Sequence, residues 1–244
     1  MTETEKKAVG RYLDWHTGIL LETDGKMGIY RKENGKLIYK EKADSEDGYL
    51  GMYLFLMGKY LEKTENTDLP EYWKKGISLA LKKIQSLMQD GITQVSEENT
   101  TVYLMDNLEV WKGLYELEHA GLKDVKAISE MRNKLQGQIE KIFWDDANQR
   151  WRIIGNSDLY HLAEFYPDGV AQIYPLIYEF PVKEKKKQKV LYDQFTESFQ
   201  WQKLNKKRTG FLWTITGMAA AQMGDINNLV ELIGNYETEY CKER

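Results

Sequence analysis

The sequence predicts an all-α protein, built as an α/α toroid of helical hairpins with one small β-hairpin. Three observations lead to this fold class. Most of the chain has helical periodicity, only four prolines occur in 244 residues, and the predicted helices alternate between two kinds. One kind has a single apolar stripe and a charged face, whereas the other is apolar around most of its circumference. Because the second kind needs cover on nearly all sides, the alternation indicates an inner and an outer layer of helices.

The predicted helices follow one another along the chain. Their expected ranges are 4–20, 46–64, 69–89, 101–120, 123–143, 167–180, 184–200, 210–223 and 225–240. The amphipathic kind includes "EYWKKGISLALKKIQSLMQ", and the apolar kind includes "GYLGMYLFLMGKYL" and "GFLWTITGMAAAQMG". The apolar helices begin near 46, 102, 167 and 210, which is too uneven for a solenoid of short repeats. Pro175 is expected to kink or end the third apolar helix.

Two β-prone runs interrupt the helical pattern in residues 27–42. This segment reads "MGIYRKENGKLIYKEK", and Asn34-Gly35 between the runs is a strong hairpin signal. A second short strand is expected at 150–154, after the turn-like "DDANQ". We expect a single α/α toroid domain over residues 1–244, with the hairpin attached at the rim of the toroid.

Composition and charge exclude several classes of partner. The chain has 42% hydrophobic and 30% charged residues and a net charge of −4, as expected for a globular protein. Its basic run "KEKKKQK" favours a solvated helix face, so no nucleic-acid partner is expected. The most apolar run, "YLGMYLFLMG", is too short to cross a bilayer, so no membrane partner is expected. The opening "MTETEKK" has no apolar signal core, which predicts a cytoplasmic protein, or a secreted one if a leader was removed.

The cysteine and histidine pattern predicts neither a metal nor a cofactor. Cys241 is the single cysteine, and His16, His119 and His161 are far apart in the sequence. None of these histidines belongs to an HxH or HExxH pattern. The sequence also has no glycine-rich phosphate loop and no serine nucleophile elbow.

Acidic residues recur at the starts of three apolar helices, and this recurrence identifies the candidate site. The three segments are "ADSEDGYLGMY", "MDNLEVW" and "FYPDGVAQIYP". If the inner helices run parallel, as the alternation in a toroid requires, these starts share one end of the barrel. We therefore predict that Asp47, Asp106 and Asp168 converge on one cleft as catalytic carboxylates.

An acid at a helix start also has a structural explanation, because it caps free N–H groups and complements the helix dipole. This explanation suits Asp168, which directly follows a proline, and it suits Asp44 with Asp47, which is close to a capping box. Asp106 follows "TTVYLM" and is expected several residues inside its helix, where capping is weak. Glu109 lies on a polar arc of the same helix, where solvation is an equal alternative.

Polar and aromatic residues near these acids are the candidates for substrate binding. The aromatic content of 12% fits either a bulky core or a groove that stacks flat ligands. Asn107 falls between two apolar stripes of its helix, so its amide is expected to be buried and to need partners. The candidate set is Tyr49, Asn107, Glu109, Trp111, His161, Tyr166, Gln172 and Trp213.

Three segments give the chain a resemblance to known proteins: "DSEDGYLGMYLFLMGKYLEKT", "GITQVSEENTTVYLMDNLEVWKGL" and "FYPDGVAQIYPLIYEF". They resemble bacterial members of the six-hairpin glycosidase-like superfamily, which includes the family 8 endoglucanases and the unsaturated glucuronyl hydrolases. The likeness spans residues 44–225. It implies a toroid with a sugar-binding cleft at the N-terminal ends of the inner helices, where Asp47, Asp106 and Asp168 would be the acids.

The chain departs from this superfamily in two respects. A full six-hairpin barrel has twelve helices, whereas about nine are predicted here, so we expect a reduced or open barrel. No catalytic motif identifies either of the two enzyme families.

Two functions are therefore expected from the sequence. The first is a glycoside hydrolase acting on a polysaccharide or oligosaccharide, in which one carboxylic acid protonates the leaving oxygen and a second carboxylate activates water. The alternative is a non-catalytic toroid protein that binds a carbohydrate or another partner and has lost its chemistry.

Overall fold

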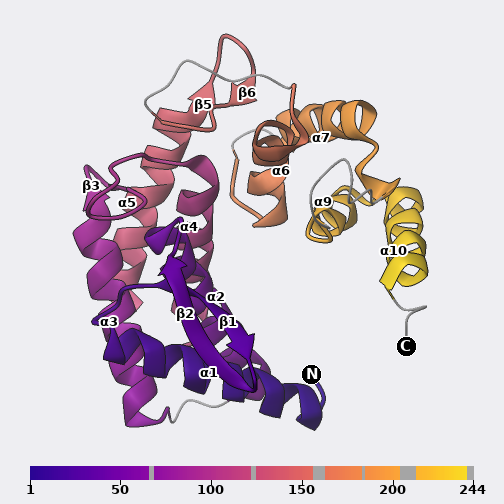
Figure 1. Ribbon diagram of the computed structural model, residues 1–244. Coiled ribbons are helices and arrows are strands. Elements are labelled where there is room, and N and C mark those ends of the chain that lie inside the picture. The colour runs from indigo at the N-terminus through magenta and orange to yellow at the C-terminus, as the bar shows by residue number, and fades with distance from the viewer. Residues whose placement is uncertain (66–68, 122–124, 156–162, 183–184, 204–212, 241–244) are drawn as a thin grey trace. The chain divides into compact units, whose positions relative to one another are not determined.

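The computed structural model describes the whole chain except residues 66–68, 122–124, 156–162, 183–184, 204–212 and 241–244 (Figure 1). The described residues form nine α-helices and three two-stranded antiparallel sheets, which confirms the predicted all-α class with a small hairpin. The chain divides into two compact units, Met1–Lys141 and Ile142–Arg244. The single toroid domain over 1–244 stays a prediction, and the two units are described separately. No described helix is long and apolar enough to cross a membrane.

The first unit contains five helices and two small sheets. In chain order these are α1 (Glu3–Glu22), β1 (Gly28–Glu33), β2 (Lys36–Lys42), α2 (Glu46–Thr64), α3 (Glu71–Leu87), β3 (Met88–Gln89), β4 (Ile92–Thr93), α4 (Leu104–His119) and most of α5 (Val125–Phe143).

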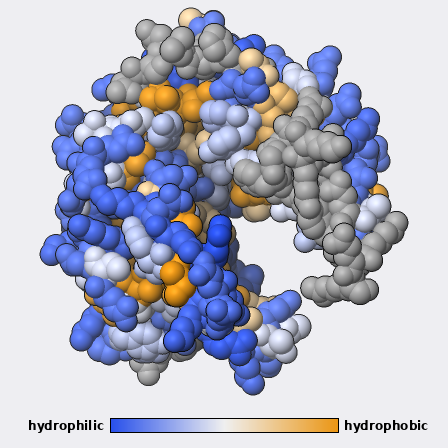
Figure 2. Space-filling model, viewed as in Figure 1, coloured by the Kyte–Doolittle hydropathy of each residue, from blue (hydrophilic) through white to orange (hydrophobic). Residues whose placement is uncertain are grey.

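The predicted β-hairpin is present as β1 and β2. Asn34 and Gly35 form its turn with φ values of 50° and 80°, which is the left-handed backbone that this dipeptide favours. Every residue of β2 is exposed, and Ile29 on β1 is exposed as well. Figure 2 accordingly shows hydrophobic residues among hydrophilic ones on the face that carries the hairpin.

The helices α2 and α3 form one antiparallel hairpin, and α4 and α5 form another. In the first hairpin, Tyr60 late in α2 packs on Trp73 early in α3, with 5.5 Å between ring centroids. In the second, Arg132 of α5 pairs with Glu118 at the end of α4, with 2.6 Å between Nε and Oε2. Both α3 and α5 are amphipathic, as predicted, and turn their apolar stripes inward.

The two apolar helices α2 and α4 lie side by side and run parallel (Figure 1). A Cβ atom on Gly113 would lie only 2.2 Å from the Gly51 carbonyl oxygen, and one on Gly58 would lie 2.6 Å from the Glu116 carbonyl carbon. Because glycine has no side chain, these residues let the two backbones touch. Because contacts advance along both helices in the same direction, the starts of α2 and α4 share one end of the unit.

Two local features differ from the sequence-based expectation. The helix α4 begins at Leu104 rather than near 101, because Thr101 accepts a backbone hydrogen bond from Val95 (3.0 Å) and so stays outside the helix. Asp106 therefore lies in the first turn of α4, and the prediction that it lies several residues inside the helix is wrong. The sheet of β3 and β4 was not predicted, although its turn has an Asp90-Gly91 pair at φ 52° and 91°.

The second unit contains the remaining elements. They are β5 (Trp144–Asp145), β6 (Arg150–Trp151), a π-helical turn η1 (Phe165–Gly169), α6 (Val170–Ile177), α7 (Lys185–Phe199), a 3₁₀ turn η2 (Trp201–Lys203), α9 (Thr216–Met223) and α10 (Ile226–Tyr240). β6 confirms a short strand within 150–154, and α6 ends two residues after Pro175, as expected. Phe165, Phe195 and Phe199 form an aromatic core between η1 and α7.

Candidate functional site

The start of α2 holds one of the predicted acids in a capping arrangement. Ser45 is the N-cap residue, and its Oγ accepts a hydrogen bond from the Gly48 N–H at 3.1 Å. The same hydroxyl donates to Asp47 Oδ1 at 2.9 Å. Asp47 is 0% exposed, so its carboxyl group lies inside the unit and not on its surface.

Asn107 connects the start of α4 to strand β4. Its Oδ1 accepts the Thr93 N–H at 2.8 Å, and its Nδ2 donates to the Thr93 carbonyl at 3.0 Å and to the Tyr103 carbonyl at 2.8 Å. The amide is fully buried and uses both ends, which confirms the expectation that a buried Asn107 needs partners. These bonds fix the orientation of the amide, with oxygen toward the Thr93 N–H.

The hydrogen bonds around Thr93 indicate the protonation state of Asp47. Thr93 Oγ1 lies 2.7 Å from Asp47 Oδ2 and 2.9 Å from Asn107 Oδ1. A hydroxyl has one hydrogen, and both neighbours are acceptors when Asp47 is ionised. Both contacts become hydrogen bonds if Asp47 is protonated and donates to Thr93, which then donates to Asn107. Burial raises the pKa of Asp47, which also favours the protonated form, although the Thr93 and Ser45 hydroxyls oppose the shift.

Asp106 differs from Asp47 because its side chain is partly exposed. Its pKa is raised to about 7, mainly by burial and in part by the neighbouring acids Asp47 and Asp44, against the opposing effect of the Ser45 hydroxyl. An ordinary aspartate at the first turn of a helix would instead be held ionised by the helix dipole. Asp106 is therefore a carboxyl group that is close to half protonated at neutral pH.

Glu109 lies one helical turn after Asp106 and faces the start of α2. Its Oε2 would lie 2.7 Å from a Cβ placed on Gly48, so the absence of a side chain at Gly48 makes room for this carboxylate. Glu46, the first residue of α2, is a further acid near the site and was not predicted as a site residue. Burial is the main cause that raises the pKa of Glu46, and Glu97 adds to the shift against Lys83 and two other lysines.

A cavity of about 380 Å³ opens beside these acids. It is lined by Tyr12 and His16 of α1, by Gly48, Tyr49, Met52, Tyr53, Phe55 and Leu56 of α2, and by Glu109 of α4. The aromatic and apolar side chains of α2 form most of the wall, and Glu109 contributes a carboxylate. Sequence reasoning missed the contribution of α1, because Tyr12 and His16 are far from the acids along the chain.

His16 is a buried polar residue in the wall of this cavity. Its side chain is 5% exposed, and neither ring nitrogen has a hydrogen-bond partner among the described residues. The ring packs against Tyr53, with 4.9 Å between centroids, and against the edge of Tyr12. Burial lowers the pKa of His16 to about 4, so the imidazole is neutral at pH 7.

The other predicted residues of the first unit divide between the cavity and the core. Tyr49 lines the cavity and is 37% exposed, which suits a surface for stacking. Trp111 is 2% exposed, and its Nε1 donates to Gln136 on α5 at 3.3 Å. Its ring therefore packs between α4 and α5 and is not among the residues that line the cavity.

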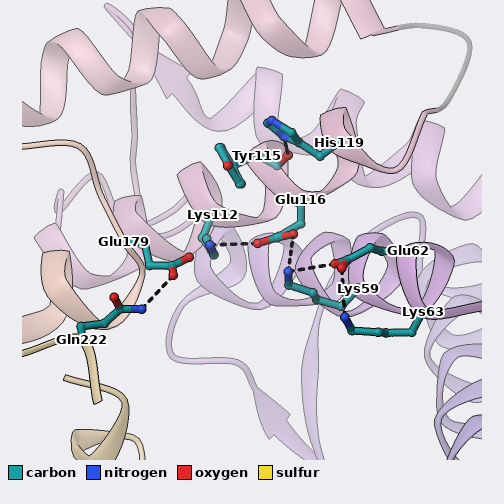
Figure 3. Close-up of polar contacts among 9 residues, drawn as sticks. All are labelled: Lys59, Glu62, Lys63, Lys112, Tyr115, Glu116, His119, Glu179 and Gln222. Carbon is teal, nitrogen blue, oxygen red and sulfur yellow. Dashed lines mark hydrogen bonds and ion pairs between the residues drawn. The ribbon is translucent and has the colours of Figure 1, made fainter. Parts of the chain in front are cut away.

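A second polar cluster lies toward the C-terminal ends of α2 and α4 (Figure 3). The buried Glu116 carboxylate pairs with Lys112 and with Lys59, each at 2.8 Å, and Lys59 also pairs with Glu62 at 3.0 Å. Two lysines thus neutralise one buried carboxylate at the contact of the two helices. This cluster is explained by helix packing, and no functional role is assigned to it.

The remaining predicted site residues belong to the second unit. Gln172 is buried and bonds the backbone N–H and C=O of Trp151, both at 2.9 Å, so it ties β6 to α6. Tyr166 is 50% exposed and lies over Trp213, with 4.9 Å between ring centroids. Asp168 lies in η1, where its carbonyl accepts a hydrogen bond from Gln172 (3.4 Å). His161 lies outside the described residues.

The structure thus brings together Asp47, Asp106, Asn107, Glu109 and Tyr49 around the starts of α2 and α4. The residues of the second unit form a separate group within that unit. Convergence of Asp168 with the two other aspartates stays a prediction.

Comparison with known proteins gives a similarity of fold. No protein-family model matches the sequence, and no curated protein matches it. Among solved structures, the chain is similar to a GH78 family rhamnosidase of Bacillus sp. GL1, with a TM-score of 0.54 and 12% sequence identity. The similarity covers 84% of this chain but 23% of the rhamnosidase chain, so this protein spans about a quarter of that enzyme's length. At this identity the comparison shows a similarity of fold alone.

Proposed function

We propose that the protein is glycoside hydrolase-like and acts on a polysaccharide or oligosaccharide by carboxylate acid/base chemistry. One observation carries the proposal: Asp106, whose pKa is raised to about 7, lies one helical turn before Glu109, and Glu109 lines an aromatic cavity. A proton donor for this reaction needs a pKa near the working pH, and burial among other acids supplies it.

The two carboxyl groups have separate roles in this proposal. Protonated Asp106 donates its proton to the oxygen that bridges two sugars, and the bond from that oxygen to the anomeric carbon breaks. Ionised Glu109 accepts a proton from the water that attacks the anomeric carbon, so the two proton transfers balance. Tyr49 offers a partly exposed ring on which a sugar face can stack.

The fold supports this proposal in two ways. The similarity to a rhamnosidase favours a carbohydrate as ligand. The two antiparallel helical hairpins of the first unit, with α2 and α4 parallel, are the repeating element of the toroid predicted from the sequence. We propose that the whole chain forms that toroid.

Release of reducing ends from a panel of polysaccharides tests the proposal. On any substrate that the parent protein cleaves, Asp106→Asn should lower the rate at least tenfold, because an amide does not donate an acidic proton. Glu130→Gln removes a carboxylate from the exposed face of α5 and should leave the rate unchanged. Full activity in folded Asp106→Asn would show that Asp106 is not the proton donor.

A non-catalytic carbohydrate-binding protein is the second candidate, and the burial of Asp47 favours it. Asp47 is enclosed by Ser45 and Thr93, so one of the three predicted acids has a structural role in the first unit. Saturable binding of an oligosaccharide without release of reducing ends would support this candidate over the hydrolase.

A further inference from the structure

The wall of the cavity has a distinctive chemical composition. Four aromatic rings contribute to it, from Tyr12, Tyr49, Tyr53 and Phe55, and Glu109 supplies a carboxylate. None of the described residues in the wall is a lysine or an arginine. Aromatic rings present a negative face, so a ring-lined cavity with a carboxylate attracts a positively charged group and disfavours an anion.

Two acids at the start of α2 and α4 act on the aromatic wall of the cavity. Burial raises the pKa of Tyr49, and the charges of Asp44 and Glu109 raise it further. Asp44 acts on Asp106 in the same sense. A cation bound in the cavity would therefore be attracted by Glu109 and by Asp44.

His16 supplies an observation that is independent of the acids. A buried imidazole without a hydrogen-bond partner is unfavourable, so a ligand group that pairs with it would be favoured. Because the ring is neutral, it adds no positive charge, and one of its nitrogens has a lone pair. Both nitrogens are buried in the structure, so a ligand N–H or hydroxyl reaches one of them only when the ring turns toward the cavity.

The size of the cavity limits its ligand. A volume of about 380 Å³ is near the lower end of the range for small-molecule sites, roughly 300–1,000 Å³. This volume suits a compact head group rather than a long chain segment.

We propose that this cavity binds an organic ammonium group, with the rings of Tyr12, Tyr49 and Tyr53 around it and Glu109 as its counter-ion. Two sources share this chemistry: a sugar unit with a free amino group inside a glycan, and a small free amine. The first source rests on the proposed function, because it requires a carbohydrate ligand. The second does not depend on it.

Calorimetric titration of the full chain at pH 7 and low salt separates the possibilities. The probes are a glucosamine oligosaccharide, the N-acetylglucosamine oligosaccharide of the same length, a glucose oligosaccharide, and tetramethylammonium. We expect the glucosamine oligosaccharide to bind at least tenfold more tightly than its acetylated counterpart, which lacks the charge. Binding should weaken as salt rises, because the attraction is electrostatic.

Variants test the roles of the wall residues. Glu109→Gln keeps the size of the side chain and should weaken binding of the ammonium probes at least fivefold, whereas the control Glu130→Gln should not change it. Tyr49→Phe keeps the ring and should bind like the parent, whereas Tyr49→Leu should bind at least threefold more weakly. Circular dichroism confirms that each variant is folded.

The outcomes distinguish failure of this inference from failure of the proposed function. Equal binding of the charged and acetylated oligosaccharides, or full affinity in Glu109→Gln, would overturn the ammonium site and leave the carbohydrate function standing. Binding of tetramethylammonium without binding of any oligosaccharide would support the ammonium site and count against the carbohydrate function. Absence of binding by all four probes would overturn the inference.

Discussion

Replacing Asp106 with asparagine should stabilise the protein at neutral and alkaline pH, and the gain should disappear in acid. The pKa of Asp106 is about 7 in the folded protein, against an ordinary value of 3.8. The folded state therefore holds a proton that the unfolded state releases, so ionising Asp106 costs stability as pH rises from about 4 to 7. Above pH 7 the full cost is present, and below pH 4 both states are protonated and the cost is absent.

The magnitude follows from the size of the shift. A change of about three pKa units, at about 1.4 kcal/mol each, sets an upper limit near 4 kcal/mol. Asp106 is partly exposed, so solvent reduces this to about 1–2 kcal/mol. The variant loses the favourable interaction of an ionised Asp106 with the helix dipole, about 0.3–1 kcal/mol, which is smaller. The net change should therefore stabilise the protein.

Thermal unfolding of both proteins between pH 4 and 9, followed by circular dichroism, measures this difference. After the dipole loss is subtracted, the net gain is up to about 1.7 kcal/mol, so at pH 8 the melting temperature of Asp106→Asn should exceed that of the parent by up to about 7 °C, given about 2–4 °C per kcal/mol for a chain of this size. Asp44→Asn removes an exposed charge at the start of α2 and should have a smaller effect. A loss of stability in Asp106→Asn at pH 8 would refute this reasoning and identify Asp106 as a structural cap.

Three further substitutions and one control substitution test the packing of the first unit. Asn107→Ala should lower the free energy of unfolding by about 1–3 kcal/mol in urea titrations, because it leaves the buried Thr93 backbone groups unpaired; an unchanged midpoint would contradict this. His16→Leu should raise the free energy of unfolding by about 1 kcal/mol, and with it the thermal midpoint, because it removes a buried ring without a hydrogen-bond partner among the described residues. A lower midpoint would mean that the imidazole has a partner. Gly113→Ala should cost about 3 kcal/mol or more, because its methyl group would meet a carbonyl oxygen at 2.2 Å, whereas Gly137→Ala, with no atom within 4 Å, should stabilise by about 0.5–1 kcal/mol in the same assay.

The parts of the fold that the sequence predicted are those set by local chemistry. Asn34-Gly35 specifies a tight turn by itself, and Gly51 and Gly113 signal close helix contact wherever their helices meet. The start of α4 was predicted wrongly because a bond from Val95 to Thr101 decides it, and no pattern within the helix reveals that pairing. Local signals therefore predicted the elements, and contacts between distant segments set their ends.

The cavity shows the same limit for the candidate site. The recurrence of acids at helix starts predicted Asp106 and Glu109 as site residues, and both lie near the start of α4 beside the cavity. Tyr12 and His16 were not predicted as site residues, because α1 does not begin with the acidic pattern that the other three helices share. Their signal in the sequence is the segment "RYLDWHTG", which places a histidine one turn after a tyrosine in an amphipathic helix.

Asp47 and Asp106 show why an acid at a helix start cannot be assigned from its position alone. Both lie in the first turn of a parallel, apolar helix, and both have a raised pKa. What separates them is Thr93, which the Asp90-Gly91 turn brings against Asp47 and Asn107. Asp47 is fully buried and lies against the Thr93 hydroxyl, which in turn contacts the buried amide of Asn107. Asp47 therefore has no access to a ligand. Asp106 is only partly buried, so the same residue type in the same position keeps some contact with solvent.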